Sequence, residues 1–258
     1  MEILFKRDEK MKLKKEWISL FEDFYQQYDS SNPKIKERYL HTYRVVDRIE
    51  QLAVSLHLTE EEIELAELIA LLHDIGRFEQ LSTYHTVNDR KSLDHGEYGV
   101  KLLFEDRLIE KFKIPEEYYP IIKASIFNHN KMELTGIKNK KEELFAKMIK
   151  DADKLDIIYL LIENNELPTT NEEVTPTCRD LFFQHQMIPY RELKTDSDHF
   201  LIYLGYVYEL YFLNSFRYLK ETKLYQRMAK ELNYPLHLKE YFQEVEKYIQ
   251  SKINYIEE

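Results

Sequence analysis

The feature that most constrains this chain is an apolar run that ends in the adjacent residues His73 and Asp74. Thr59 can cap a helix at the start of the run, and Glu62 three residues later completes a capping box. The positions between are mostly apolar: Ile63, Leu65, Ala66, Leu68, Ile69, Ala70, Leu71 and Leu72. A helix that is apolar nearly all round lies in a protein interior. Burying His73 and Asp74 there is costly unless they are satisfied, and a divalent cation does this well.

The preceding segment predicts a helix over about 33–56, with Asn32 as its cap and proline in its first turn. His41 lies on this helix, 17 residues before the turn near Leu58, and His73 lies 15 residues after that turn. At 1.5 Å per residue, both imidazoles are roughly 22–26 Å from the turn of an antiparallel hairpin. His41 and His73 are therefore expected at the same height, where they could share one ion.

With a distant Asp153 in an Ala-Asp-Lys-Leu context, these residues form the ordered set His41, His73-Asp74 and Asp153. This set resembles the HD superfamily of metal-dependent phosphohydrolases, and the resemblance covers roughly residues 35–160. It implies an all-helical domain in which the two His and two Asp side chains bind a divalent metal. The set is far more specific than a lone His-Asp pair.

Two further histidines stand where bimetallic members of that superfamily carry additional ligands. His95 is expected in the first turn of a helix capped by Ser92 or Asp94, and His129 at the end of a helix that begins at Pro115. The resemblance implies a second ion at these residues, with the Asp74 carboxylate as the bridge. The alternative is a mononuclear site in which both imidazoles are satisfied by backbone carbonyls or water.

The segment 77–93 shows no clean period, so we expect a long loop that forms one wall of a substrate pocket. Gly76 is expected to let the chain leave the preceding helix in the left-handed conformation. Arg77 has two interpretations of equal weight. Its guanidinium could grip a phosphate, which would make Arg77 and Asp74 the catalytic residues, or it could pair with a carboxylate such as Glu79.

Residues 141–162 show apolar positions at helical spacing, and three acids lie close together on this expected helix. Asp153 matches the superfamily pattern best and is the predicted metal ligand. Asp156 is about 60° away around the helix, where it could orient a ligand. Asp151 is about 160° away and is expected to be solvated.

The composition favours an all-α protein, because only 5 Gly and 7 Pro accompany 33% charged residues. We expect one HD-type domain over 1–258, a helical bundle with its core at about 31–162 and an added C-terminal helical layer at about 165–258. That layer either packs on the domain or forms a homodimer interface. Further helices are expected over residues 8–28, 179–187, 196–219 and 236–256.

The net charge of −10 argues against nucleic acid as a partner, because its backbone requires a basic surface. Cys178 is the single cysteine, which fits a reducing compartment. The apolar patch within residues 1–8 is too short for a signal peptide, and no uncharged apolar run approaches the length of a membrane span. A cytoplasmic protein is therefore expected.

The predicted function is hydrolysis of a phosphate ester or anhydride, in a small nucleotide-like substrate that the resemblance implies. The chain has no Gly-rich phosphate loop, and a mixed His/Asp set suits one or two ions of Mn, Fe, Co, Ni or Zn. Such an ion lowers the pKa of water and polarises a phosphoryl oxygen. The alternatives are a di-iron oxygenase on the same fold and a non-catalytic metal-binding protein.

Overall fold

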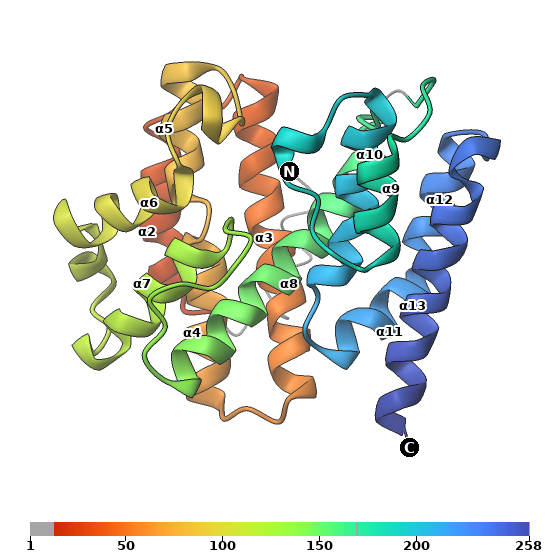
Figure 1. Ribbon diagram of the computed structural model, residues 1–258. Coiled ribbons are helices and arrows are strands. Elements are labelled where there is room, and N and C mark those ends of the chain that lie inside the picture. The colour runs from red at the N-terminus through yellow and green to blue at the C-terminus, as the bar shows by residue number, and fades with distance from the viewer. Residues whose placement is uncertain (1–12, 169, 258) are drawn as a thin grey trace. The chain divides into compact units, whose positions relative to one another are not determined.

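The computed structural model describes residues 13–168 and 170–257, which are helical with no strand among them (Figure 1). The all-α prediction is thus confirmed. The chain divides into two compact units, Met1–Ala152 and Asp153–Glu258. Helix α8 (Lys140–Glu163) lies within one residue at each end of the helix predicted over 141–162. The division between the units falls inside this helix. The expectation of a single domain over 1–258 stays a prediction.

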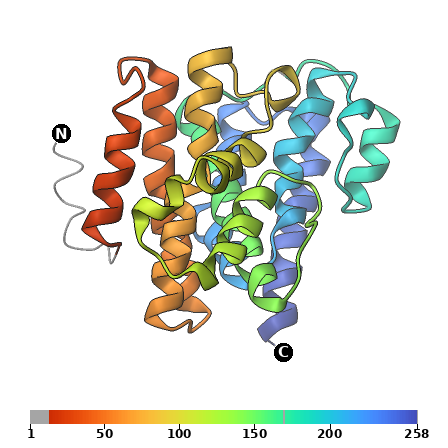
Figure 2. The ribbon, with the colours of Figure 1, turned by 90° about the vertical axis from the view of Figure 1, so that its left-hand side faces the viewer.

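The N-terminal unit is built on the predicted antiparallel hairpin of α3 (Pro33–Ser55) and α4 (Glu60–Leu72), which lie side by side in Figures 1 and 2. Asn32 caps α3 through its side chain, and Thr59 and Glu62 form the predicted capping box at the start of α4. These caps satisfy backbone donors that have no partner within the helix. The sequence therefore determines where both helices begin.

Helix α4 is the buried element that its composition predicts, because every residue from Leu65 to Leu72 is buried. Each large aliphatic side chain buried in this way contributes about 1.5–3 kcal/mol. Helix α2 (Lys15–Tyr25) packs beside it, and the indole of Trp17 donates a hydrogen bond of 2.8 Å to the Phe112 carbonyl. The helix predicted over 8–28 is shorter at its end, and its first residues lie outside the described part.

The loop predicted over 77–93 is wrong in its first half, because α5 (Ile75–Tyr84) continues directly after α4. Phe78 and Leu81 are buried at helical spacing. This apolar stripe is too short among its polar neighbours to show a clear helical period in the sequence. Gly76 lies inside α5 and does not adopt the left-handed conformation. Its predicted role as a helix terminator is therefore wrong.

Helix α6 (His95–Val100) is capped by Asp94, whose side chain accepts a hydrogen bond from the Glu97 backbone. A π-helical turn follows it at Lys101–Glu105. Two 3-10 turns, Leu108–Phe112 and Glu116–Tyr118, then lead to α7 (Tyr119–Asn128). The predicted placements of His95 in a first turn and of His129 at a helix end are both confirmed.

Glycines allow α5, α6 and α7 to approach closely. A Cβ atom at Gly76 would overlap the carbonyl oxygen of His95 and lie 2.9 Å from the Gly99 nitrogen. A Cβ atom at Gly96 would lie 3.0 Å from the carbonyl oxygen of Ile126. Only hydrogen at these positions permits the backbone of α6 to lie this close to both neighbours.

The C-terminal unit packs α13 (Lys239–Glu257) against four shorter helices around its own core, as Figure 1 shows. Those helices are α9 (Pro176–Phe183), α10 (Asp196–Gly205), α11 (Leu213–Thr222) and α12 (Leu224–Glu231). Short 3-10 turns lie at Tyr190–Glu192, Tyr206–Glu209 and Leu236–Leu238.

The single helix predicted over 196–219 is wrong, because the chain is extended at Leu210 and Phe212 before α11 begins. Leu210 and Phe216 would lie about 120° apart around a continuous helix. Breaking the helix allows both side chains to be buried in the core of this unit. Helix α9 begins earlier than predicted because Pro176 occupies its first turn.

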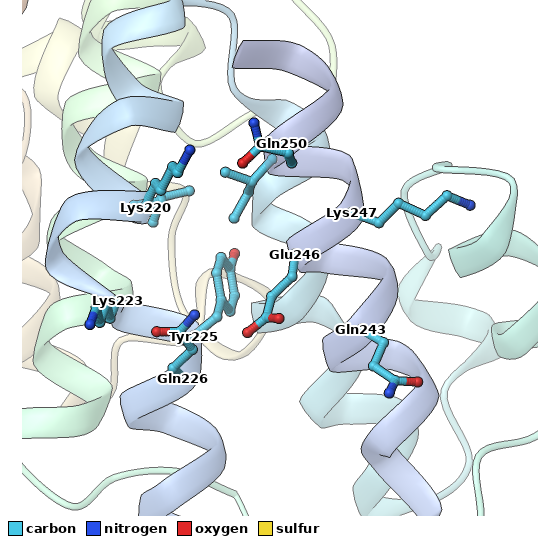
Figure 3. Close-up of a pocket in the computed structure, with 10 residues that line it drawn as sticks. Lys220, Lys223, Tyr225, Gln226, Gln243, Glu246, Lys247 and Gln250 are labelled. Carbon is cyan, nitrogen blue, oxygen red and sulfur yellow. The ribbon is translucent and has the colours of Figure 1, made fainter. Parts of the chain in front are cut away.

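A surface pocket of about 410 Å³ lies between α11, α12 and α13 (Figure 3). Its rim carries the exposed side chains of Lys220, Lys223 and Lys247, and Glu246 points toward Tyr225 in its interior. The Tyr225 hydroxyl is buried and donates to the Leu204 carbonyl at 3.2 Å.

Within residues 13–168 and 170–257, each helix is too short or too polar to cross a lipid bilayer.

Gly76→Ala should destabilise the protein by about 1–3 kcal/mol or more, because its methyl group would collide with rigid backbone. Gly205→Ala is the matched control, since the nearest atom to a Cβ there is 3.9 Å away. That change should be neutral or mildly stabilising. Urea unfolding of both variants tests this, and an unchanged midpoint for Gly76→Ala would show that the helices need no close approach.

Candidate metal centre

His41 and His73 meet across the α3–α4 hairpin, as their distances from the turn predict. Their ring centroids are 5.3 Å apart, and both side chains are fully buried. His73 caps the C-terminal end of α4, where its Nδ1 lies 2.7 Å from the Ala70 carbonyl oxygen. A carbonyl oxygen can only accept, so Nδ1 donates and the Nε2 of the neutral ring carries the lone pair.

The carboxylate of Asp74 lies among four imidazoles. Oδ2 is 3.8 Å from Nε2 of His41 and 3.9 Å from Nε2 of His73. Oδ1 is 3.4 Å from Nε2 of His95 and 3.6 Å from Nε2 of His129. Asp74 stands at the N-cap of α5 but makes no capping bond with its side chain. Each carboxylate oxygen therefore faces a different pair of histidines.

The second pair comes from the junction of α6 and α7. Nε2 of His95 and Nε2 of His129 are 2.8 Å apart. Nδ1 of His129 lies 2.7 Å from the Ile126 carbonyl oxygen, and Nδ1 of His95 lies 2.8 Å from Oδ2 of Asp89. Since both Nδ1 atoms face acceptors, they donate, and the two Nε2 atoms face one another as acceptors.

Two acceptors at this distance repel unless a cation lies between them, so the geometry provides a test of metal fit. Two nitrogens bound to one ion at 2.0–2.1 Å would be about 2.9 Å apart at the right angles of octahedral coordination and about 3.3 Å apart in a tetrahedral site. The 2.8 Å spacing of His95 and His129 is close to the octahedral value. Two groups of described residues could each hold an ion, and both are buried: His41, His73 and Asp74, and Asp74, His95 and His129.

Comparison with known protein families gives a match to the HD domain over residues 38–158. Residues 38–158 form an HD domain. No curated protein and no solved structure matches the chain. HD domains typify a superfamily of metal-dependent phosphohydrolases, and the buried His/Asp cluster of this HD domain is compatible with a divalent metal.

Electrostatics within the HD domain keep the candidate ligands in the forms that bind metal. Burial, reinforced by the Arg77 guanidinium, lowers the pKa of His95 to about 4, so its ring is neutral near pH 7. Burial alone would raise the pKa of Asp74. The imidazoles of His73, His129 and His95 and the Arg77 guanidinium oppose this effect, and the pKa of Asp74 lies well below its usual range.

Of the predicted site residues, the structure brings together His41, His73, Asp74, His95 and His129. Asp153 lies on α8, just past the division between the units, with a side chain that is largely buried. Its assignment as a ligand stays a prediction. The prediction that Asp151 is solvated is wrong, because Asp151 is fully buried. Asp151 is buried because α8 is enclosed around much of its circumference, so that even Lys150 is inaccessible to solvent.

Arg77 pairs with a carboxylate, but that partner is Asp89 rather than Glu79. Its Nη1 lies 2.7 Å from Oδ1 of Asp89, and its Nε lies 3.6 Å from Oδ1 of Asp74. The buried Nε has no hydrogen-bond partner among the described residues. The role of Arg77 toward a phosphate stays a prediction.

Sequence reasoning missed two charged neighbours of this centre. Nη1 of Arg38 lies 3.6 Å from Oδ2 of Asp74. Its position three residues before His41 places it on the same helical face, so the spacing contained a usable signal. Asp89 contacts His95 from a loop-like segment, and its type and position gave no signal of this role. Burial would raise the pKa of Asp89, but His95 and Arg77 hold it well below its usual range.

Asp74→Asn should remove metal binding, because the amide lacks the charge and presents only one acceptor oxygen toward the two histidine pairs. Metal content of the purified variant after dialysis against Mn²⁺ or Zn²⁺ tests this. His85→Asn is the control, since His85 is exposed in a left-handed conformation that asparagine tolerates. Full metal content in Asp74→Asn would show that the ion lies elsewhere.

Acid should destabilise the metal-free protein between about pH 6.5 and about pH 4, the ordinary and folded-state pKa values of His95. The unfolded chain binds this proton more tightly, so lowering the pH favours unfolding by about 3 kcal/mol from this group. Urea unfolding with a chelator at each pH measures the effect. His95→Gln should flatten the curve over this range, and an equally steep curve would contradict the assignment.

Proposed function

We propose that this chain hydrolyses a phosphate ester or anhydride in a small nucleotide-like molecule. A divalent metal would be bound at the buried His/Asp cluster of the HD domain. The observation that carries the proposal is the position of Asp74, with one oxygen facing His41 and His73 and the other facing His95 and His129. A carboxylate in this position can bridge two cations.

The proposed centre holds two ions of Mn, Fe, Co, Ni or Zn, one beside each histidine pair. The donor set supports these metals because it combines imidazole and carboxylate without any thiolate. Asp153 is proposed as a further ligand from the superfamily pattern. When bound, such ions supply Lewis acidity toward water and toward a phosphoryl oxygen.

The chain's own contribution to substrate binding is two guanidinium groups beside Asp74. Arg38 lies near Oδ2 and Arg77 near Oδ1, and each side chain is only 16% exposed. A guanidinium presents several donors in one plane and binds phosphate oxygens well. Arg38 and Arg77 are therefore proposed to orient the phosphate, despite the net charge of −10 for the whole chain.

The expected partner is thus a small phosphorylated molecule, with neither nucleic acid nor a membrane as a partner. The same nitrogen and oxygen donors also suit iron, which keeps a di-iron oxygenase as the second candidate. Oxygen consumption and phosphate release distinguish the two reactions directly.

The test is metal analysis of protein purified without oxygen, followed by a screen of phosphorylated metabolites with each added metal. We expect about two metal equivalents per chain, and release of phosphate or pyrophosphate that chelator abolishes. Asp74→Asn, which removes the bridge, should release none, and His85→Asn should match the wild type.

Other outcomes would overturn the proposal. Iron-dependent oxygen uptake without phosphate release would favour the oxygenase. Metal-loaded protein that releases no phosphate and consumes no oxygen would indicate a non-catalytic metal-binding protein. One equivalent in the wild type and in His95→Gln would reduce the centre to a single ion at His41 and His73.

A further inference from the structure

Asp89 lies at the centre of a hydrogen-bond network beside the second histidine pair. Its Oδ1 accepts from Nη1 of Arg77 at 2.7 Å and from Nε2 of Gln80 at 2.8 Å. Its Oδ2 accepts from Nδ1 of His95 at 2.8 Å and from Nδ2 of Asn130 at 3.0 Å, and Nδ1 of His95 also lies 2.9 Å from Oδ1. All four partners come from outside the short 3-10 turn that carries Asp89.

This network determines which nitrogen of His95 carries the proton. A carboxylate only accepts hydrogen bonds, so Nδ1 of His95 must donate to Asp89. In the neutral ring, Nε2 is then an acceptor, and it points toward His129 at 2.8 Å and Asp74 at 3.4 Å. His73 and His129 obtain the same tautomer from carbonyl oxygens within their own helices.

We propose that Asp89 is a positioning residue that holds His95 in the tautomer required for metal binding. This proposal rests on the metal-binding part of the proposed function and not on the reaction itself. A carboxylate behind a metal-bound imidazole both orients the ring and fixes its proton, and removing such a partner commonly weakens metal binding 10–100-fold.

Asp89→Asn should reverse the tautomer because of the way the donors are arranged around residue 89. Each oxygen accepts from two donors, but only the Oδ1 side receives a guanidinium, which is always protonated, so the single amide oxygen is expected to face Arg77 and Gln80. The amide NH₂ group then replaces Oδ2, the nearer of the two oxygens to Nδ1 of His95, and donates to that nitrogen. The proton of the neutral ring moves to Nε2, where it can donate to Nε2 of His129 and compete with an ion.

A purely structural role for Asp89 makes a different prediction. In that case, Asp89 only holds the 3-10 turn Asp89–Lys91 against α5. Its replacement should then lower the stability of the fold without changing the tautomer of His95. Asp94→Asn is the matched control, because it removes the same charge nearby and leaves α6 capped, since asparagine caps as well as aspartate. The Asp94 side chain contacts Asn130 and Lys131.

The first measurement is the ¹⁵N spectrum of histidine-labelled, metal-free protein, in which His95→Gln identifies the His95 signals. Wild type and Asp94→Asn should show Nδ1–H at His95, and Asp89→Asn should show Nε2–H. An Nε2–H tautomer in the wild type would overturn the proposal whether or not any variant folds. An unchanged tautomer in Asp89→Asn would also overturn it.

The second measurement is titration of the same proteins with Zn²⁺ alone. In Asp89→Asn, the ion that needs His95 and His129 should bind about 10–100-fold more weakly, while the ion at His41 and His73 changes by less than about 3-fold. Equal weakening of both ions, or the same loss in Asp94→Asn, would indicate a structural role. If the wild type binds no ion, the proposed function fails, and the tautomer alone decides the role of Asp89.

Discussion

The constraint on which the HD domain depends is the burial of four imidazoles around one carboxylate. Nε2 atoms of four imidazoles lie within 3.9 Å of the Asp74 oxygens, in a region that solvent does not reach. Nε2 of His95 and Nε2 of His129 face one another as acceptors, and two buried acceptors this close are unfavourable unless a cation lies between them. The packing of the apolar α4 must therefore hold this arrangement together until a cation compensates it.

The same local hydrogen bond, from an imidazole to a backbone carbonyl at a helix end, orients two of these histidines. His73 closes α4 and His129 closes α7, and each donates its Nδ1 proton to the carbonyl three residues earlier. Carbonyls at a helix end have no partner within the helix, so the imidazole satisfies one of them while its own rotation is fixed. A helix that ends in histidine thus provides a preorganised ligand without any additional residue.

The sequence predicts one half of this centre by geometry and the other only by resemblance. The proximity of His41 and His73 follows from the helix rise and a single turn. In an antiparallel hairpin, two residues at similar sequence distances from the turn lie at similar positions along the two helices. His95 and His129 come from short elements whose approach depends on glycine contacts between α5, α6 and α7, and no spacing rule predicts such contacts. Helix α5 was missed because its apolar stripe is short. Asp89 was missed because a hydrogen bond between segments leaves no periodic signal.

The histidines also differ in what holds them, and this difference bears on how the centre can be adjusted. His73 and His129 obtain their orientation from backbone within their own helices, so any state that keeps those helices keeps these candidate ligands in place. His95 depends on the Asp89 side chain, which is 26% exposed and belongs to a short turn between helices. Elements with few buried contacts open at lower free energy than a core helix does. An opening of this turn would release His95 and Arg77 together, because both donate to the same carboxylate. One half-buried acid therefore couples a candidate metal ligand to a candidate substrate-binding side chain.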